Sequence, residues 1–451
     1  MRRTLPVLSA VIAIALLAGC SGDGDAAEPT PSAAGSSAAP SSTPAPSPSA
    51  SASPSPSAAP SATGDPVRIR ATVTGLHVAG VQDGAWPDDN VPFGALRLWD
   101  NGTAWSQIEL EPGVYKWDNL EGVLENAQSK GMTDVLMVLG TTPEWNAKTI
   151  SPDDYPQPGA ASAPKDLKAW DAWVTEVATR YKGRISAYQI WNEANLKNFW
   201  NGTPEEMADL TKRAYDIIKA IDPEATVVSA SPSTRLTGPF EKFFPAYLDA
   251  LAAKDWPIDV VAIHTYPSAD GDPVARGLVI KAVREYLTAA GAPELPLWDT
   301  ELNYGLAGPG DLPKQEITGA KAAGWVVRTY IDDLRYDVAR SYWYIWTQKP
   351  YDLLGIQAYP GSDAEQGFFA LENWVFGADF GGCATEDSGA VVCDFSKAGT
   401  SWVVAWAENG DAPYTAPEGT KLICDPLANC QEVEAGAQIT LTEIPVRLFL
   451  Q

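Results

Sequence analysis

Short apolar runs with strand character alternate with helical patterns from about residue 65 to residue 373 of this 451-residue chain. This alternation is typical of parallel α/β architecture, because each helix returns the chain to the edge at which the next strand begins. Eight strand candidates are at 71–77, 95–99, 134–139, 185–191, 226–230, 260–264, 295–299 and 341–345. They predict a (β/α)8 TIM barrel over residues 65–376. An open doubly wound sheet is the alternative, but no glycine-rich phosphate loop follows the first strand.

Two of the intervening helices have recognisable ends. One shows apolar residues at helical spacing over 167–181, and Gly183 follows at a C-cap position. The other begins at Thr203, which can cap the helix, with Pro204 in the first turn and Glu206 completing a capping box. Both helices occupy connections that a barrel requires.

The pattern changes after a helix predicted at 363–374. Alternating strand runs follow at 390–395, 401–407, 421–424 and 438–448. They predict a small C-terminal β-sandwich over 377–451, with the structural role of covering a flank of the barrel. A sugar-binding module is the alternative, but Trp402 and Trp406 occupy the alternate positions expected of core residues.

Residues 1–19 combine two arginines, an apolar run and a small-residue ending, which is typical of an export signal. The ending Leu-Ala-Gly-Cys resembles the lipobox of bacterial lipoproteins and implies a lipid at Cys20; an ordinary cleaved signal, giving a freely secreted protein, is the alternative. Residues 20–64 are mostly Ser, Ala and Pro, so they are predicted to form a disordered tether. We therefore expect an exported, lipid-anchored protein that faces outside the cell membrane.

The remaining four cysteines are Cys383, Cys393, Cys424 and Cys430. An even number in an exported chain favours disulfides. Proximity suggests that Cys383 pairs with Cys393 and Cys424 with Cys430, although three pairings are open. A zinc site is the competing interpretation, but the spacings fit none of the usual ligand pairs and no histidine lies nearby.

The formal net charge of the chain is -25. This charge argues against nucleic acid or anionic lipid headgroups as partners, and it favours a neutral or small ligand. No feature of the sequence indicates an obligate protein partner.

Two glutamates end predicted strands. Glu193 ends the fourth strand beside Trp191, and Glu301 ends the seventh beside Trp298. Cleaving a glycosidic bond needs one carboxylic acid to protonate the leaving oxygen and one carboxylate to meet the positive charge at the anomeric carbon. Since barrel strands end around one mouth, the two glutamates predict a sugar-cleaving site without a cofactor. The alternative is that they are solvated residues where a strand meets a loop.

Two other acidic residues are weaker candidates. Asp299 has the same strand parity as Glu301, which would point both to one face, and it is the rival nucleophile. It would sit one layer deeper, where bracing the pocket is the more common role. Glu144, after the third strand, is more typical of a binding or loop residue.

Polar residues near the pair are candidate substrate contacts. Asn192 is placed to hydrogen-bond the 2-hydroxyl of a sugar, unless it only caps a loop. Arg97, at the end of the second strand, would keep Glu301 ionised, unless it forms a structural ion pair with Asp100.

Histidine and tyrosine residues extend this group. Tyr266 could donate a hydrogen bond to Glu301, and His264 to a sugar hydroxyl, although a structural histidine is the ordinary interpretation. His77 ends the first strand and is expected to face the same mouth. Two histidines at separate strand ends make a weak case for metal, and we predict none.

Several tryptophans fall in or beside loops at the predicted mouth, where flat rings suit the apolar faces of sugars. They are Trp86, Trp99, Trp105, Trp145, Trp200 and Trp346. Several of them must be core residues.

The Trp-Asn-Glu ending of strand four, the glutamate of strand seven and Trp346 after strand eight resemble the clan A glycoside hydrolases. Within that clan, Arg97-Leu98-Trp99, His264-Thr265-Tyr266 and the trailing β-sandwich are most similar to family 39, which includes β-xylosidases and α-L-iduronidases. The resemblance covers about residue 67 to the C-terminus. Its motifs are specific for mechanism and poor for substrate.

The resemblance implies that Glu193 is the general acid/base, that Glu301 is the nucleophile and that anomeric configuration is retained. It also implies that Trp346 forms a wall of the subsite for the cleaved sugar. The two glutamates of a retaining pair must be about 5 Å apart. Packing against Trp191 and the negative charge of Glu301 would both raise the pKa of Glu193. The alternatives are a transglycosylase that uses the same residues and a non-catalytic carbohydrate-binding lipoprotein.

Overall fold

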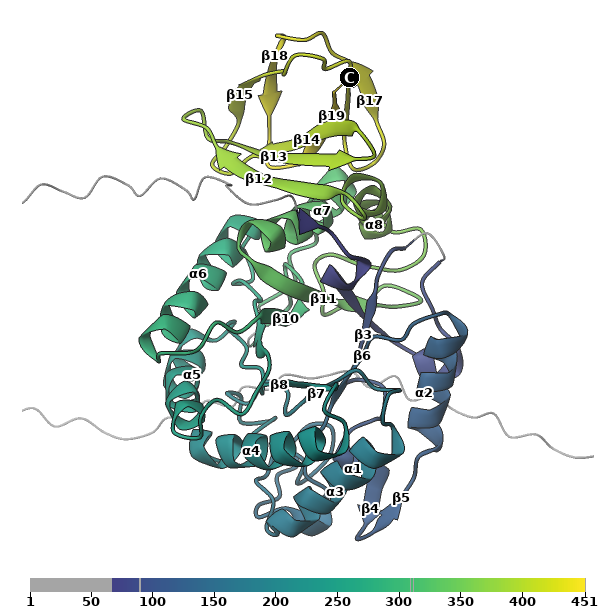
Figure 1. Cartoon of the computed structure of the whole chain (residues 1–451), viewed down its shortest axis with the longest axis vertical. Coiled ribbons are helices and arrows are strands. Elements are labelled where there is room, and N and C mark those ends of the chain that lie inside the picture. Colours follow the sequence, from purple (N-terminus) through teal and green to yellow (C-terminus); the bar gives the residue numbers. More distant parts are fainter. Residues whose placement is uncertain (1–66, 89–90, 309, 311, 451) are drawn as a thin grey trace, which may run out of the picture.

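The structure is a computed structural model that describes residues 67–450, apart from 89–90, 309 and 311 (Figure 1). The predicted signal peptide, Cys20 and the tether lie outside the described residues. Within the described residues, none of the helices has both the length and the apolar character needed to cross a membrane.

A closed barrel of eight parallel strands forms the larger part of the molecule (Figure 1). Its strands, in spatial order, are β8 (Thr226–Val228), β7 (Ala187–Gln189), β6 (Val135–Val138), β3 (Ala95–Leu98), β2 (Thr74–Val78), β11 (Val338–Trp346), β10 (Leu297–Leu302) and β9 (Val261–His264). A parallel bridge between Val228 and Val260 joins the two ends of this order and closes the ring. The predicted TIM barrel is therefore confirmed, and all eight predicted strands overlap the observed ones.

Helices surround the barrel as an outer layer (Figure 1). They are α1 (Trp105–Ile108), α2 (Asp118–Ser129), α3 (Leu167–Arg180), α4 (Pro204–Ile221), α5 (Thr237–Ala252), α6 (Pro273–Ala289), α7 (Gly319–Arg335) and α8 (Asp363–Trp374). Short 3-10 turns are η1 (Ala71–Val73), η2 (Val81–Asp83) and η3 (Glu144–Asn146), and a small hairpin joins β4 (Glu109–Glu111) to β5 (Val114–Tyr115).

The predicted helix ends can be compared directly with the structure. Thr203 caps α4, and its side chain and that of Glu206 form the predicted capping box. The C-cap of α3 was predicted at Gly183, but the helix is capped two residues earlier, at Tyr181. Gly183 has a φ of 71° and instead forms the turn that leads to β7.

The interior of the barrel is built in layers. Side chains at alternate strand positions form a buried apolar cluster that includes Ala95, Leu136, Ala187, Val228, Ala262, Trp298 and Tyr342. Because side chains on one face recur every second residue, the next inward position of each strand lies closer to its carboxyl end. On β3, β7 and β9 those positions are Arg97, Gln189 and His264. The apolar floor is therefore covered by a polar layer at the mouth.

The C-terminal part is rich in antiparallel strands and lies against one side of the barrel (Figure 1). Its main sheet has the order β1 (Val67–Arg68), β12 (Asp379–Thr385), β13 (Ala390–Lys397), β14 (Thr400–Ala407), β19 (Val446–Phe449), β16 (Leu422–Cys424) and β17 (Cys430–Glu432), and β15 (Ala412–Thr415) pairs with β18 (Gln438–Leu441). The strand predicted over 438–448 is thus two strands, separated by a turn that contains Pro445. Strand β1 comes from the other end of the described chain, although its residues were predicted to belong to the barrel.

Both proposed disulfides, Cys383–Cys393 and Cys424–Cys430, are present. Each joins residues that are directly opposite in an antiparallel pair. The predicted pairing is therefore confirmed.

The junction between the two parts is packed and hydrogen-bonded. Trp402 and Trp406 are buried, which matches the prediction that they are core residues rather than exposed sugar platforms. Trp402 Nε1 donates to the Trp374 carbonyl oxygen at 3.0 Å, and the Arg328 guanidinium lies 5.5 Å from the centre of the Trp406 ring. The sandwich therefore covers helices α7 and α8, as predicted.

Candidate active site

Glu193 lies in the loop between β7 and α4 and is 9 % exposed. Its φ is 41°, a left-handed conformation that is uncommon for a residue other than glycine. Hydrogen bonds on both sides hold this loop: the Ala194 amide donates to the Ser231 carbonyl oxygen at 3.1 Å, and the Leu196 amide donates to the Glu193 carbonyl oxygen at 2.9 Å. Such strain persists only where surrounding structure enforces it, and it is common at functional sites.

Glu301 lies within β10 and is 5 % exposed. Its Oε1 accepts a hydrogen bond from Arg97 Nη1 at 2.8 Å, and its Oε2 accepts one from the Tyr266 hydroxyl at 3.0 Å. The structure therefore brings together the three residues that the sequence associated. An Arg97 guanidinium and a hydroxyl donor both favour the ionised form of this carboxyl.

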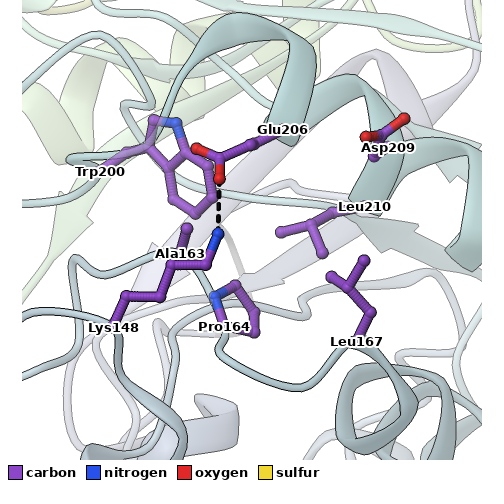
Figure 2. Close-up of a pocket in the computed structure, with 8 residues that line it drawn as sticks. All are labelled: Lys148, Ala163, Pro164, Leu167, Trp200, Glu206, Asp209 and Leu210. Carbon is purple, nitrogen blue, oxygen red and sulfur yellow. Dashed lines mark hydrogen bonds and ion pairs between the residues drawn. The ribbon is translucent and has the colours of Figure 1, made fainter.

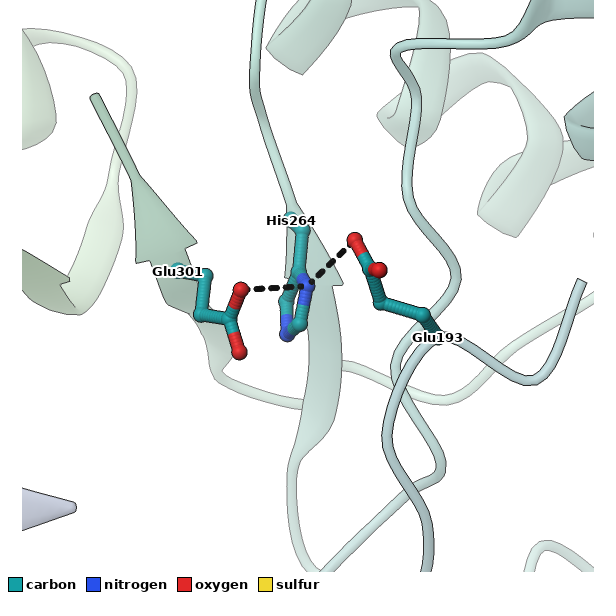
Figure 3. A group of neighbouring side chains, drawn as sticks. All are labelled: Glu193, His264 and Glu301. Carbon is teal, nitrogen blue, oxygen red and sulfur yellow. Dashed lines mark hydrogen bonds and ion pairs between the residues drawn. The ribbon is translucent and has the colours of Figure 1, made fainter. Parts of the chain in front are cut away.

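His264 stands between the two glutamates (Figure 3). Its Nδ1 lies 3.2 Å from Glu193 Oε1 and 3.4 Å from Glu301 Oε2. A carboxylate oxygen of each glutamate and a ring nitrogen of His264 all lie within 4.8 Å of one another. Burial lowers the pKa of His264 to about 3, so the ring is neutral near pH 7 and shares one hydrogen bond with Glu193 through Nδ1.

The same three side chains could accept a divalent cation, since they offer one nitrogen and two oxygen atoms close together. The guanidinium of Arg97 already neutralises Glu301 at 2.8 Å, however. A cation placed beside that carboxylate would also face the positive charge of Arg97, which disfavours binding.

Arg97 is fully buried and uses all three of its nitrogens. Besides Glu301, it donates from Nε to Gln189 Oε1 at 2.8 Å and from Nη2 to Asn192 Oδ1 at 2.7 Å. The alternative ion pair with Asp100 is not found among the described residues. Because guanidinium only donates, Asn192 must present its carbonyl oxygen to Arg97, which leaves its amide nitrogen as a donor for a ligand.

His77 is buried beneath this layer. Its Nε2 lies 3.0 Å from the Thr300 carbonyl oxygen and 3.1 Å from Arg97 Nη1. Burial and the charge of Arg97 lower its pKa, so it is neutral. In the structure His77 therefore supports Arg97 and strand β10.

Asp299 does not point to the same face as Glu301. It is 0 % exposed, accepts a hydrogen bond from Arg276 Nη2 at 2.8 Å, and also binds the backbone and side chain of Thr265. A register irregularity between Asp299 and Glu301 interrupts the strand alternation, so the parity argument for a rival nucleophile was wrong. Asp299 instead braces the segment that carries His264 and Tyr266.

Trp346 is 0 % exposed and belongs to the main hydrophobic core, so the structure does not support its predicted role as a subsite wall. A register irregularity between Trp343 and Trp346 breaks the alternation here too. Tyr344, which the prediction missed, clusters with Tyr266 and places its ring 5.0 Å from that of His77.

Trp145 and Glu144 have other surroundings. Trp145 Nε1 donates to the Glu109 carbonyl oxygen at 2.9 Å, and its ring packs edge-on against Trp105. Glu144 is exposed on η3. Neither Trp145 nor Glu144 contacts Glu193 or Glu301 within the described residues.

A separate cavity of about 150 Å³ opens beside α4 (Figure 2). The ion pair between Lys148 Nζ and Glu206 Oε1, 2.6 Å apart, lies beside Trp200 at this cavity. Neither catalytic candidate lines it. The cavity is therefore distinct from the glutamate pair.

Arg235 was also missed by the prediction. It precedes α5, and its Nη2 donates to the Leu306 carbonyl oxygen at 3.0 Å, which ties the loop before α5 to the loop after β10. Burial raises the pKa of Glu193, while a hydrogen bond with Ser233 and the charges of Arg235 and Arg97 oppose that shift. No periodic sequence signal marks Arg235, because it lies in a loop.

Burial also raises the pKa of Glu301, and His264 and Arg97 oppose the rise. Among the described residues, Glu301 has an arginine in direct contact, at 2.8 Å, and Glu193 has none. When one proton is shared by two close carboxyls, it therefore resides on Glu193. The site can hold one protonated and one ionised carboxyl at the same time.

A closed barrel with two glutamates facing each other across its mouth defines the class of glycoside hydrolase barrels. The model of the glycosyl hydrolases family 39 matches residues 112–348, which is more than half of the chain. The protein belongs to this family.

Two curated relatives are similar over part of the chain. A beta-xylosidase of Caldicellulosiruptor saccharolyticus is 30% identical over 205 residues, which cover 41% of this chain and 40% of that protein. A beta-xylosidase of Geobacillus stearothermophilus is 26% identical over 171 residues, 32% of each chain. The match thus spans less than half the length of either relative.

The fold is similar to that of a monomeric beta-xylosidase from Caulobacter crescentus CB15, with a TM-score of 0.60 and 17% identity, covering 86% of this chain and 97% of that one. At this identity the likeness supports the fold alone. It extends across both the barrel and the C-terminal strands.

Proposed function

We propose that this protein is a retaining glycosidase that hydrolyses O-glycosidic bonds by double displacement. Glu193 is the general acid/base and Glu301 the nucleophile. The observation that carries the proposal is that a carboxylate oxygen of each lies within 4.8 Å of the other. Retaining pairs stand about 5–5.5 Å apart, whereas inverting pairs need about 6.5–9.5 Å to admit a water molecule.

In the first step, a Glu301 oxygen attacks the anomeric carbon while Glu193 transfers its proton to the leaving oxygen. The bond to the leaving group breaks, and a glycosyl ester forms on Glu301. In the second step, Glu193, now ionised, takes a proton from water as the water oxygen attacks the same carbon. The ester bond breaks, the sugar leaves with its original configuration, and both glutamates return to their starting states.

The neighbouring residues support these roles through contacts described above. Arg97 and Tyr266 hold the oxygens of Glu301, and they stabilise its negative charge as it is regenerated in the second step. Asn192 offers its amide nitrogen to the 2-hydroxyl of the sugar. His264 keeps the two carboxyls in a fixed relation.

A transglycosylase would use the same residues with a sugar as acceptor in the second step. Product analysis with and without oligosaccharide acceptors separates the two reactions. A non-catalytic receptor is less consistent with two carboxyls held at this spacing, because sugar binding alone does not require them.

The first test is turnover of a panel of nitrophenyl glycosides, beginning with the β-D-xyloside because two relatives are named as beta-xylosidases. We expect hydrolysis of at least one member. Proton NMR during the first turnovers should show that the released sugar has the same anomeric configuration as the substrate. An initial product of opposite configuration would contradict the double displacement. No turnover of any glycoside would contradict a hydrolytic role.

We also propose that the protein is exported and anchored through a lipid on Cys20, so that it acts on glycans outside the cell. The proposal depends on the lipobox-like ending before Cys20 and the Ser/Ala/Pro-rich stretch after it. The full chain should partition into the detergent phase in Triton X-114, and Cys20→Ser should move it to the aqueous phase, because the proposed lipid on Cys20 supplies the membrane affinity. Aqueous partitioning of the wild type would support free secretion instead.

A further inference from the structure

A third carboxyl lies at the mouth, beyond the proposed catalytic pair. Asp100 stands two residues after β3, three residues beyond Arg97, and is half-buried. Its Oδ1 accepts a hydrogen bond from the Tyr155 hydroxyl at 3.0 Å. Its Oδ2 is shielded from solvent and accepts no hydrogen bond of good geometry within the described part of the chain, although the Tyr344 hydroxyl lies close enough to lower the Asp100 pKa.

The surroundings of Asp100 are rigid. The Tyr155 ring packs 5.9 Å from Trp99 and 5.6 Å from Phe199, and the Tyr155 amide donates to the Asn198 carbonyl oxygen at 2.8 Å. The loops after β3, β6 and β7 therefore meet at this carboxyl. Side chains held in this way have a fixed geometry before any ligand arrives.

Asp100 interacts electrostatically with both glutamates of the pair. Burial raises the pKa of Asp100. Hydrogen bonding by the Tyr344 and Tyr155 hydroxyls and the charge of Arg97 oppose this shift, and the charge of Glu193 reinforces it. Asp100 in turn contributes to the raised pKa of Glu301. Arg97 is already bound to Gln189, Glu301 and Asn192, so it does not satisfy the second oxygen of Asp100.

A buried acceptor without a donor is costly, by about 1–3 kcal/mol, unless a ligand or water supplies the missing hydrogen bond. Sugar hydroxyls are donors, and carboxylates are the strongest acceptors that a protein offers them. We propose that Asp100 is a specificity-determining residue that accepts a hydrogen bond from a hydroxyl of the sugar held between Glu193 and Glu301. This inference rests on the proposed function.

The contacts also indicate which hydroxyl is involved. The two glutamates address the anomeric carbon, and the Asn192 amide is directed to the hydroxyl at C2. For a pentose, the hydroxyls that remain are those at C3 and C4. Asp100 is therefore assigned to one of these two positions.

The test measures kcat/KM for nitrophenyl β-D-xyloside and its 2-, 3- and 4-deoxy analogues with wild type and Asp100→Ala. A hydrogen bond to a charged group corresponds to about 10–100-fold in kcat/KM. The wild type should lose that factor with the 3-deoxy or the 4-deoxy analogue. Asp100→Ala should lose a similar factor with the parent xyloside and show no further loss with that analogue.

Asp100→Asn tests the charge with little change in shape, and its KM should rise because the amide is a weaker acceptor. Tyr155→Phe should have a smaller effect, since it removes only the donor to the other oxygen. Asp411→Asn is the matched control, because Asp411 is exposed in a turn of the sandwich. Thermal melting identifies any variant that fails to fold.

Equal deoxy penalties in wild type and Asp100→Ala would overturn the inference. The inference would also be overturned if the wild type showed no loss of kcat/KM with either the 3-deoxy or the 4-deoxy analogue. That measurement requires no variant. Failure of the proposed function has a different signature: no nitrophenyl glycoside is turned over by the wild type. If another glycoside of the panel is the better substrate, its own deoxy series serves as the probe.

Discussion

Glu301→Ala is expected to lower kcat/KM for an activated nitrophenyl glycoside by at least about 10⁴-fold, because the covalent step loses its nucleophile. The variant leaves a space beside Arg97 and Tyr266 that a small anion can enter. Added azide should therefore restore turnover and give a glycosyl azide. Its anomeric configuration should be opposite to that of the substrate, since a single displacement replaces two.

The matched control is Glu144→Ala, which removes an exposed carboxyl from η3 that contacts neither glutamate within the described residues. Its kcat/KM should stay within about twofold of the wild type, as is usual for a surface change. A rescued azide product with the substrate's own configuration would show that Glu301 is not the nucleophile.

Glu193→Ala is expected to have an effect that depends on the leaving group. For a poor leaving group that needs protonation, kcat/KM should fall by about 10²–10⁴-fold, the usual contribution of general acid catalysis. For a dinitrophenyl glycoside, which leaves without a proton, the first step should be nearly unaffected. Azide should then attack the glycosyl ester on Glu301 and give a product with retained configuration. Equal losses for both leaving groups would contradict this role.

The same residue sets the pH dependence. Burial raises the pKa of Glu193 above its usual value, and the general acid is active only while protonated. In the wild type, kcat/KM should therefore fall as the pH rises through this pKa. With Glu193→Ala and the dinitrophenyl substrate, this alkaline decline should disappear, whereas a decline at low pH from protonation of Glu301 should remain.

Much of the fold was predictable because its signals are local. Residues close together in sequence produce the apolar runs of the barrel strands. They also produce the Thr203 capping box and the helix at 363–374. The disulfide pairs were accessible for the same reason, since each closes a short loop. The β1 pairing with β12 was not, because it joins residues about three hundred positions apart and leaves no short-range pattern.

The site was predictable in part. The approach of Arg97, Tyr266 and His264 to the glutamates followed from strand order in a barrel, which brings carboxyl ends together. Arg235, Tyr344 and the Tyr155 contact to Asp100 were missed, because they come from loops or from a position whose direction depends on exact register. Trp346 was assigned to the sugar on the basis of a family resemblance, and packing placed it in the core.

The sequence alone specifies a barrel of eight parallel strands and two carboxyls at its mouth, because the residue periodicity that marks a strand is local to that strand. The tertiary structure decided which side chains at the strand ends enter the site. Irregularities between Asp299 and Glu301 and between Trp343 and Trp346 interrupt the alternation of faces. They depend on the pairing of neighbouring strands, so they turn Glu301 inward and leave Asp299 on Arg276 in a way that no single strand encodes.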